Sequence, residues 1–319
     1  MKKLFIFLCL TLGLLACNKR NADVIGHCGS TSSVLLQELS AYNDSVVISM
    51  NLTRMSADGR RSLVMYADAV GVMNGASDGS AIGGIVGLAF GNPLIGHVVG
   101  GVVGGLMIGA AYSFITYKGI TSDAEVDLDE TYNKTVASLI QSGLLELIKI
   151  DDVKDSSDYV KQVHVERIER PALNISVPEK NQDAIYVAEG HNAALDLMIQ
   201  PDVSLKGTEL IESEVLQILY SNEMKSKFIE LCNLLTEQIV SGGKAIVLAP
   251  DEKSGMIVEK YLELYDGYDV KIEKSVEVTN KYIEIIENSD ELTEEQKQIV
   301  YNSLVVASYS TDFWTGFDL

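Results

Sequence analysis

Apolar residues recur along most of this chain at intervals of three and four, which is the period of an amphipathic α-helix. The pattern predicts an all-α or mostly α fold with a C-terminal helical bundle. The predicted helices are 31–70 with a break, a helix ending near Ile150, 208–220, 221–240, 251–265, 276–286 and a last one from Thr293 onward. Short strands are predicted only at 245–248 and 270–272, while 159–187 fits a strand or a helix end. The predicted bundle core comprises Leu210, Leu216, Leu219, Phe228, Leu231, Leu235, Ile257, Leu262, Ile283, Ile299 and Val305.

Capping residues indicate where two of these helices begin. Thr293 is followed three residues later by Gln296, which is the spacing of a capping box. Asp129 is a candidate N-cap for the helix that ends near Ile150. The acidic segments 118–130 and 151–158 are predicted as solvated loops. The first lacks the central Gly of a calcium-binding EF-hand loop.

Glycine in the middle of the chain follows a fixed spacing. One series recurs every four residues before Asn92-Pro93 and a second one follows it: Gly71, Gly75, Gly79, Gly83, Gly87 and Gly91, then Gly96, Gly100 and Gly104. Spacing of four places each series on one helix face. Each Gly costs a helix about 1 kcal/mol relative to Ala, so close approach to another helix must repay it. The pattern predicts a helical hairpin, 71–91 and 94–117, with glycine packed on glycine.

This spacing resembles the glycine zippers of bacterial envelope lipoproteins and of some pore-forming bacteriocins. The resemblance concerns packing and implies no catalytic residue. Gly79 to Tyr117 contains no Asp, Glu, Lys or Arg, and the second leg is long enough to cross a bilayer. The charge-free part of the first leg is too short to do so. Two alternatives follow: a membrane-inserted hairpin, or one buried among the protein's own helices. Self-association between chains is a third use of the same face.

The N-terminus has the pattern of an export signal. Lys2 and Lys3 precede an apolar run that ends in Leu14-Leu15-Ala16-Cys17. The run resembles the signal and lipobox of bacterial lipoproteins, which implies cleavage before Cys17 and lipidation of its thiol with palmitate-type acyl chains. The resemblance places the protein in the bacterial cell envelope, at the periplasmic face or the cell surface, with membrane lipid as a partner.

The patterns together divide the chain into six segments. They are the signal peptide 1–16, a tether 17–30, a helical segment 31–70, the hairpin 71–117, a helix with acidic linker 118–180 and an acidic helical domain 181–319. Two cysteines remain after export, Cys28 and Cys232, and either a disulfide or two separate thiols, with Cys232 in the core, is consistent with the sequence.

Charge and motif composition limit the chemistry. With 25 Lys and Arg against 45 Asp and Glu, the chain has a formal charge of −20, which disfavours nucleic acid as a partner. Metal-ligand spacings, phosphate loops and dinucleotide motifs are absent from the sequence, so no metal or cofactor is expected. Gly75-Ala76-Ser77-Asp78-Gly79 matches the nucleophile elbow of α/β-hydrolases, but its glycines belong to the four-residue series. Among the histidines, only His191 is a candidate catalytic residue. The alternative for His191 is a capping or packing role.

The sequence therefore predicts a non-enzymatic, lipid-anchored envelope protein. Its hairpin would serve membrane insertion or helix association, and its C-terminal helices would bind a protein partner. The alternatives are a secreted membrane-active antagonist that forms pores and, in the enzyme class, a serine hydrolase using Ser77. The segments 190–196 and 303–309, with Trp314 beyond them, are similar to parts of uncharacterised exported bacterial proteins and imply no activity.

Overall fold

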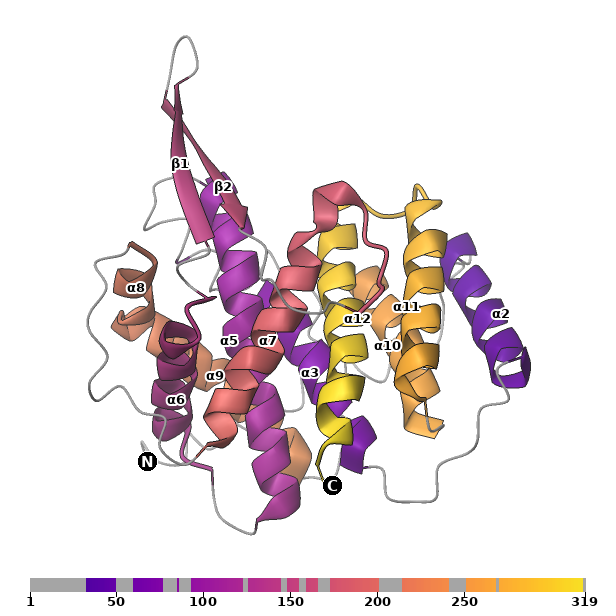
Figure 1. Ribbon diagram of the computed structural model, residues 1–319, viewed down its shortest axis with the longest axis horizontal. Coiled ribbons are helices and arrows are strands. Elements are labelled where there is room, and N and C mark those ends of the chain that lie inside the picture. The colour runs from indigo at the N-terminus through magenta and orange to yellow at the C-terminus, as the bar shows by residue number, and fades with distance from the viewer. Residues whose placement is uncertain are drawn as a thin grey trace, which may run out of the picture. The chain divides into compact units, whose positions relative to one another are not determined.

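The computed structural model describes residues 33–49, 60–76, 85, 93–122, 126–144, 148–154, 159–165, 173–200, 214–240, 251–267 and 270–317. In chain order, the elements are α2 (Val34–Ser49), α3 (Arg60–Ala76), α5 (Pro93–Thr121), α6 (Leu128–Gln141), β1 (Ile148–Lys154), β2 (Tyr159–Val165), the 3-10 turn η2 (Glu179–Asn181), α7 (Asp183–Ile199), α8 (Glu214–Leu219), α9 (Asn222–Val240), α10 (Glu252–Gly267), α11 (Ile272–Glu287) and α12 (Glu294–Thr315) (Figure 1). The mainly α-helical fold predicted from the sequence is confirmed.

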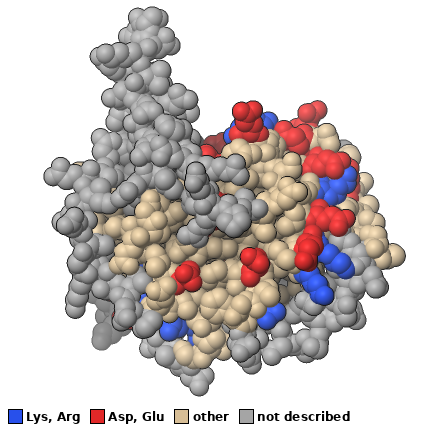
Figure 2. Space-filling model, viewed as in Figure 1, with Lys and Arg blue, Asp and Glu red and all other residues tan. Residues whose placement is uncertain are grey.

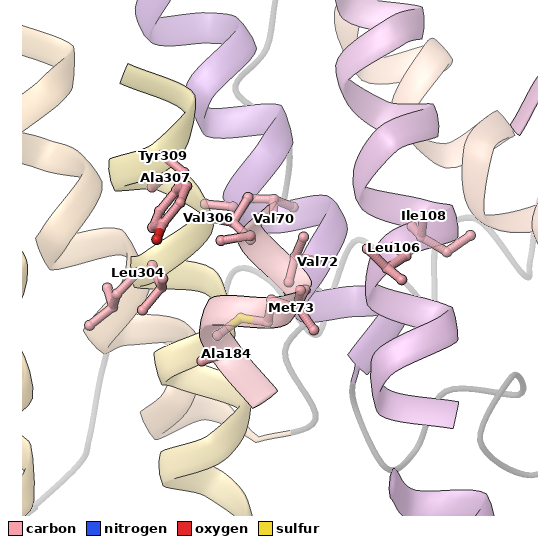
Figure 3. Packing of buried hydrophobic residues seen from close by; sticks show 14 of the residues in the cluster. Val70, Val72, Met73, Leu106, Ile108, Ala184, Leu304, Val306, Ala307 and Tyr309 are labelled. Carbon is pink, nitrogen blue, oxygen red and sulfur yellow. The ribbon is translucent and has the colours of Figure 1, made fainter. Parts of the chain in front are cut away.

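Helices α3, α5, α7 and α12 form the centre of the fold. Helix α3 packs against α5 and α12, while α7 packs against α5 and α12. Val70, Leu106, Ala184 and Leu304, one from each helix, have exposed fractions of 0% (Figure 3). Because α3 and α5 precede residue 180 and α7 and α12 follow it, one hydrophobic core runs across the predicted boundary between the two helical parts of the chain.

The helix predicted to end near Ile150 is shorter than expected. Helix α6 ends at Gln141, and Gly143 follows with φ of +70°, a conformation that favours glycine and ends the helix. Its N-cap is Asp127, whose side chain accepts hydrogen bonds from the backbone N–H groups of Asp129 and Glu130. The prediction of Asp129 as N-cap was therefore wrong by two residues.

An antiparallel hairpin lies where the sequence predicted an acidic loop. Strands β1 and β2 pair from Ile148 with Val165 to Lys154 with Tyr159. The acidic residues of this segment interrupt the alternation of apolar and polar residues. The sequence pattern was therefore too weak to predict the strand β1. For the segment from residue 159, the strand alternative is the one observed.

The C-terminal helices follow the sequence prediction closely. Thr293 caps α12, and Gln296 completes the predicted capping box by accepting from the Thr293 N–H. The short strand predicted at 270–272 was wrong, because Ile272 begins α11, whose buried positions recur with helical spacing. Of the predicted core, Leu231 is half-buried and the buried members are Leu216, Leu219, Phe228, Ile257, Leu262, Ile283, Ile299 and Val305. Leu210 and the side chain of Leu235 lie outside the described part, as does segment 245–248.

Candidate functional site

Helices α3 and α5 approach each other through glycine. A methyl group placed on Gly75 would fall on the backbone carbonyl of Gly104 in α5. One on Gly71 would lie 2.9 Å from the Ile108 carbonyl oxygen and 3.0 Å from the Gly109 Cα. Side chains cannot occupy these positions unless the two backbones separate. The backbones of α3 and α5 thus meet where Gly75 lies against Gly104 and Gly71 lies against Ile108 and Gly109.

The remaining predicted packing positions fall into two groups. Gly100 is buried in α5, and Gly96 belongs to the first turns of the same helix. Gly79, Gly83, Gly87 and Gly91 lie outside the described residues, as do Cys17 and Ser77. The described part of the first predicted leg, 71–76, is the end of a helix that begins at Arg60, and the second leg begins at Pro93. Helix α5 is therefore slightly longer at both ends than the predicted 94–117.

Helix α5 is covered by the protein's own helices. The segment Gly100–Thr121 is long and apolar enough to cross a membrane, and 89% of its most apolar stretch is buried. Helix α7 contributes to the cover through another small residue, Gly190, where an added methyl group would lie 2.8 Å from a Leu106 methyl carbon. A buried core helix has the same length and composition as a membrane span, and this one is placed as a core helix.

Four side chains from the four central helices meet inside this core. Asp68 of α3, Ser113 of α5, His191 of α7 and Trp314 of α12 have exposed fractions of 0 to 1%. We call them the Asp68 cluster. The indole N–H of Trp314 donates to Asp68 Oδ2 at 2.9 Å, and the Ser113 hydroxyl donates to Asp68 Oδ1. His191 Nε2 lies 3.0 Å from Ser113 Oγ and 3.7 Å from Asp68 Oδ1.

Neighbouring hydrogen bonds constrain the protons of the Asp68 cluster. Asn192 donates its amide N–H to the Tyr309 carbonyl, and its Oδ1 lies 3.0 Å from His191 Nδ1. Nδ1 therefore carries a proton, and Nε2 faces the carboxylate. Burial raises the pKa of Asp68 to about 6, although the nearby His191 and the hydrogen bond from Trp314 lower it.

The Asp68 cluster contains the residue types of a serine hydrolase in a different arrangement. In a catalytic triad the carboxylate binds Nδ1 of the histidine, and the serine binds Nε2. Here Asp68 and Ser113 both lie at Nε2, and Nδ1 faces Asn192. The Ser113 hydroxyl is also within 2.9 Å of the Gly109 carbonyl and is fully buried, so no substrate reaches it in this conformation. The arrangement joins side chains of α3, α5, α7 and α12 in the core.

Sequence reasoning singled out His191 but did not associate it with Asp68, Ser113 or Trp314. These residues are far apart in the sequence: 246 positions separate Asp68 from Trp314, and 78 separate Ser113 from His191. One signal was present. Asp68 interrupts an apolar run that leads into the glycine series, and a carboxylate in such a run requires a partner when it is buried.

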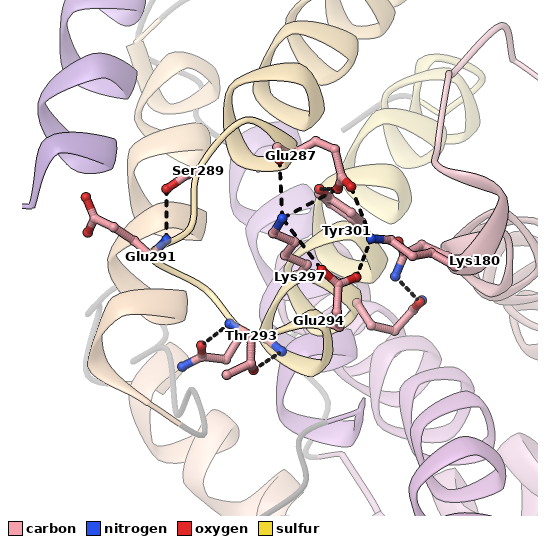
Figure 4. Close-up of polar contacts among 11 residues, drawn as sticks. Lys180, Glu287, Ser289, Glu291, Thr293, Glu294, Lys297 and Tyr301 are labelled. Atoms are coloured by element: carbon pink, nitrogen blue, oxygen red, sulfur yellow. Dashed lines mark hydrogen bonds and ion pairs between the residues drawn. The ribbon is translucent and has the colours of Figure 1, made fainter.

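The surface at the start of α12 carries a network of paired charges. Lys180 binds Glu287 and Glu294 at 3.1 and 2.5 Å, and Tyr301 donates to Glu287 at 2.8 Å (Figure 4). These bonds, with the nearby Lys297, hold the pKa of Glu287 below its usual value. Acidic side chains gather toward the α11 side of the face in Figure 2. The network joins η2, α11 and α12. Glu287 and Glu294 therefore have a structural role.

Among the described side chains, no group of three or more His, Cys, Asp and Glu could hold a metal ion. Cys232 is fully buried in α9, as its apolar surroundings predict, and burial raises the pKa of its thiol; Cys28 lies outside the described residues. Comparisons with protein-family models, curated proteins and solved structures find no match for this chain.

Proposed function

We propose that this protein is a non-enzymatic, lipid-anchored component of the bacterial cell envelope. In this proposal Cys17 carries the lipid, the glycine-rich helices α3 and α5 act in helix association, and the helical unit binds a partner. The observation that carries the helix-association role is the approach of Gly75 to the Gly104 backbone. Glycine at such a contact repays its cost to helix stability only where backbones touch.

The burial of α5 favours helix association over permanent insertion. Helix α5 packs against α3, α6, α7 and α9, and its Tyr112 hydroxyl donates to the Leu231 carbonyl of α9 at 2.9 Å. Transfer of α5 into lipid would break these contacts and separate Ser113 from Asp68 and His191. The polar groups left in the core would lose their partners at a cost of about 1–3 kcal/mol each.

A second candidate function, a membrane-active antagonist, rests on the composition of α5. Residues 93–117 contain no charged side chain, and α5 extends over 29 residues, enough to cross a hydrocarbon core of about 30 Å. In this alternative the shell of helices keeps α5 covered until it meets a target membrane. Before α5 could insert, its backbone contacts with Gly71 and Gly75 of α3 would have to break.

Flotation with liposomes separates the two candidates. We expect the mature chain, from residue 17 onward with Cys17→Ser, to remain unbound. The unchanged chain, expressed in bacteria, should fractionate with membranes and incorporate labelled palmitate. If the Cys17→Ser chain floats with liposomes and stays bound in high salt and carbonate, membrane insertion replaces helix association as the proposed role. Release of a dye from the liposomes would then test pore formation. Absence of label from the unchanged chain would contradict the lipid anchor.

The enzyme alternative is tested by Ser77→Ala together with Ser113→Ala. Both variants should leave membrane fractionation unchanged. If the purified chain hydrolyses ester substrates and Ser77→Ala abolishes that activity, the non-enzymatic proposal is wrong. Ser113→Ala serves as the matched control, because its hydroxyl is enclosed in the core.

A further inference from the structure

A cavity of about 370 Å³ lies between the start of α3, the end of α10, the start of α11 and the end of α12. This volume is at the lower end of the range for small-molecule sites. Its inner wall is apolar: Met65, Val270 and Trp314 line it and have exposed fractions of 6, 7 and 1%. The cavity lies outside the α3–α5 contact and uses no residue of the lipid anchor.

The rim of the cavity carries charges of both signs. Arg61 and Lys271 contribute two cations, and Glu273 and Asp312 contribute two carboxylates; all four side chains are exposed. The Arg61 guanidinium donates to the Phe317 carbonyl at 3.4 Å. No ion pair within 4.0 Å joins Arg61 or Lys271 to either of these two carboxylates. Most other lysines in the described part of the chain bind a carboxylate: Lys134, Lys180, Lys225, Lys227, Lys253, Lys260, Lys281 and Lys297.

The hydroxyl groups of the wall add an acceptor. Tyr265 and Thr311 line the cavity and belong to a buried chain of hydroxyls with Tyr261, Thr279, Ser275 and Ser308. Thr279 and Thr311 donate their protons to the backbone carbonyls of Ser275 and Ala307. The Ser275 hydroxyl donates its one proton to Ser308, so it does not also donate to Thr311, 3.4 Å away. The Thr311 oxygen can therefore accept a further hydrogen bond.

From these observations we infer that the cavity is a binding site for a small zwitterion with an apolar side chain, the chemistry of a free apolar amino acid. Its carboxylate is matched by Arg61 and Lys271, and its ammonium by Asp312 and the neighbouring Thr311 hydroxyl. Its side chain is matched by the apolar wall. A ligand with one charge would leave rim charges of that same sign without a partner, whereas a zwitterion satisfies both signs.

Trp314 makes the test direct, because it is the only tryptophan of the chain and it lines the cavity. We would titrate the Cys17→Ser chain with L-leucine, L-methionine and L-phenylalanine, up to about 20 mM, and record Trp314 fluorescence. The matched probes are 4-methylpentanoate, which lacks the ammonium of leucine, and 3-methylbutylamine, which lacks its carboxylate. We expect saturable binding of at least one amino acid. For leucine, each matched probe should bind about tenfold more weakly or worse.

Two substitutions assign the charges. Asp312→Asn should weaken leucine binding about tenfold and leave 4-methylpentanoate unchanged, whereas Arg61→Gln should weaken both. Asp290→Asn is the control, since Asp290 is an exposed carboxylate away from the cavity. The inference is overturned if no amino acid changes the fluorescence, if either singly charged probe equals leucine, or if Asp290→Asn weakens binding as much as Asp312→Asn.

Discussion

The contact between α3 and α5 and the contacts among α10, α11 and α12 pack helices by opposite means. In the first, glycine has no side chain to separate the helices, so the two backbones are in direct contact. In the second, large side chains fill the space: Tyr261 and Tyr282 are fully buried, with ring centroids 5.1 Å apart at an interplanar angle of 82°. Their hydroxyls then require partners, and Tyr261 bonds Tyr265 and Thr279 while Tyr282 donates to Asn43 of α2.

The difference shows in what each contact tolerates. A backbone contact has no flexible atoms that could move to admit an added methyl group. The tyrosine contact consists of separable parts, so the removal of one hydroxyl leaves the ring packing in place. We therefore expect small changes to be more costly between α3 and α5 than between α10 and α11.

The largest effect should come from Gly75→Ala. Its added methyl group would overlap the Gly104 carbonyl, so we expect a loss of about 3 kcal/mol or more in the free energy of unfolding, measured in urea. Gly101→Ala is the matched control in α5, because its methyl group would lie 3.8 Å from the Ala76 carbonyl. It should be neutral or gain up to about 1 kcal/mol from helix propensity. Equal losses in both variants would refute the backbone contact.

Asp68→Asn tests the polar cluster beside the glycine contact. The pKa of Asp68 is about 6 when folded, against an ordinary value of 3.8, so the folded state binds the proton more tightly. This group therefore adds stability as pH falls from 6 to below 4, and that stability is lost again as pH rises through 6.

Asparagine in place of Asp68 removes this titration. At pH 7.5 the variant should be more stable than the unchanged chain, by about 3 kcal/mol at most, and the difference should shrink toward pH 4. Urea unfolding from pH 4 to 8 measures it. A difference that is independent of pH would contradict the buried-charge interpretation.

Tyr282→Phe should have a smaller effect in the tyrosine contact. It removes the 2.6 Å bond to Asn43 Oδ1 and keeps the ring. The expected loss is about 1–2 kcal/mol, because the Asn43 oxygen remains buried with one partner fewer. Tyr42→Phe on α2 is the comparison, since the Tyr42 ring also contacts Tyr282, at 5.9 Å. Tyr282→Phe should cost more than Tyr42→Phe; a loss as large as that of Gly75→Ala would remove the contrast between the two contacts.

Thr293→Ala should have the smallest effect. It removes the hydrogen bond that the Thr293 side chain accepts from the Gln296 N–H, which is worth about 1 kcal/mol at a helix start. Thr293→Ser retains the hydroxyl and should restore most of the stability in the same urea experiment. If the serine variant loses as much as the alanine variant, the cap contributes through methyl packing instead.

Local patterns predicted the helices and their ends where one short motif decides the structure. The Thr293 box and Pro93 at the start of α5 are examples. The spacing of Gly71 and Gly75 predicted a backbone contact. Prediction failed where tertiary packing determines the structure. The strands β1 and β2 lack a clear alternation of apolar and polar residues. The Asp68 cluster brings together four helices that are distant in sequence. Sequence reasoning also could not bring Arg61, Lys271 and Asp312 together at one cavity, for the same reason.

The cover of α5 also has a consequence for the order of events during synthesis. Helix α5 is complete at Thr121, but α7, which packs on it, ends at Ile199, and α12, which closes the core against α3, begins at Glu294. A growing chain would thus expose a helix that carries no charge from residue 93 to 117 while more than half of its sequence is still missing. Contacts of such long range form slowly. We therefore expect the apolar surface of α5 to stay uncovered until the C-terminal helices have been synthesised.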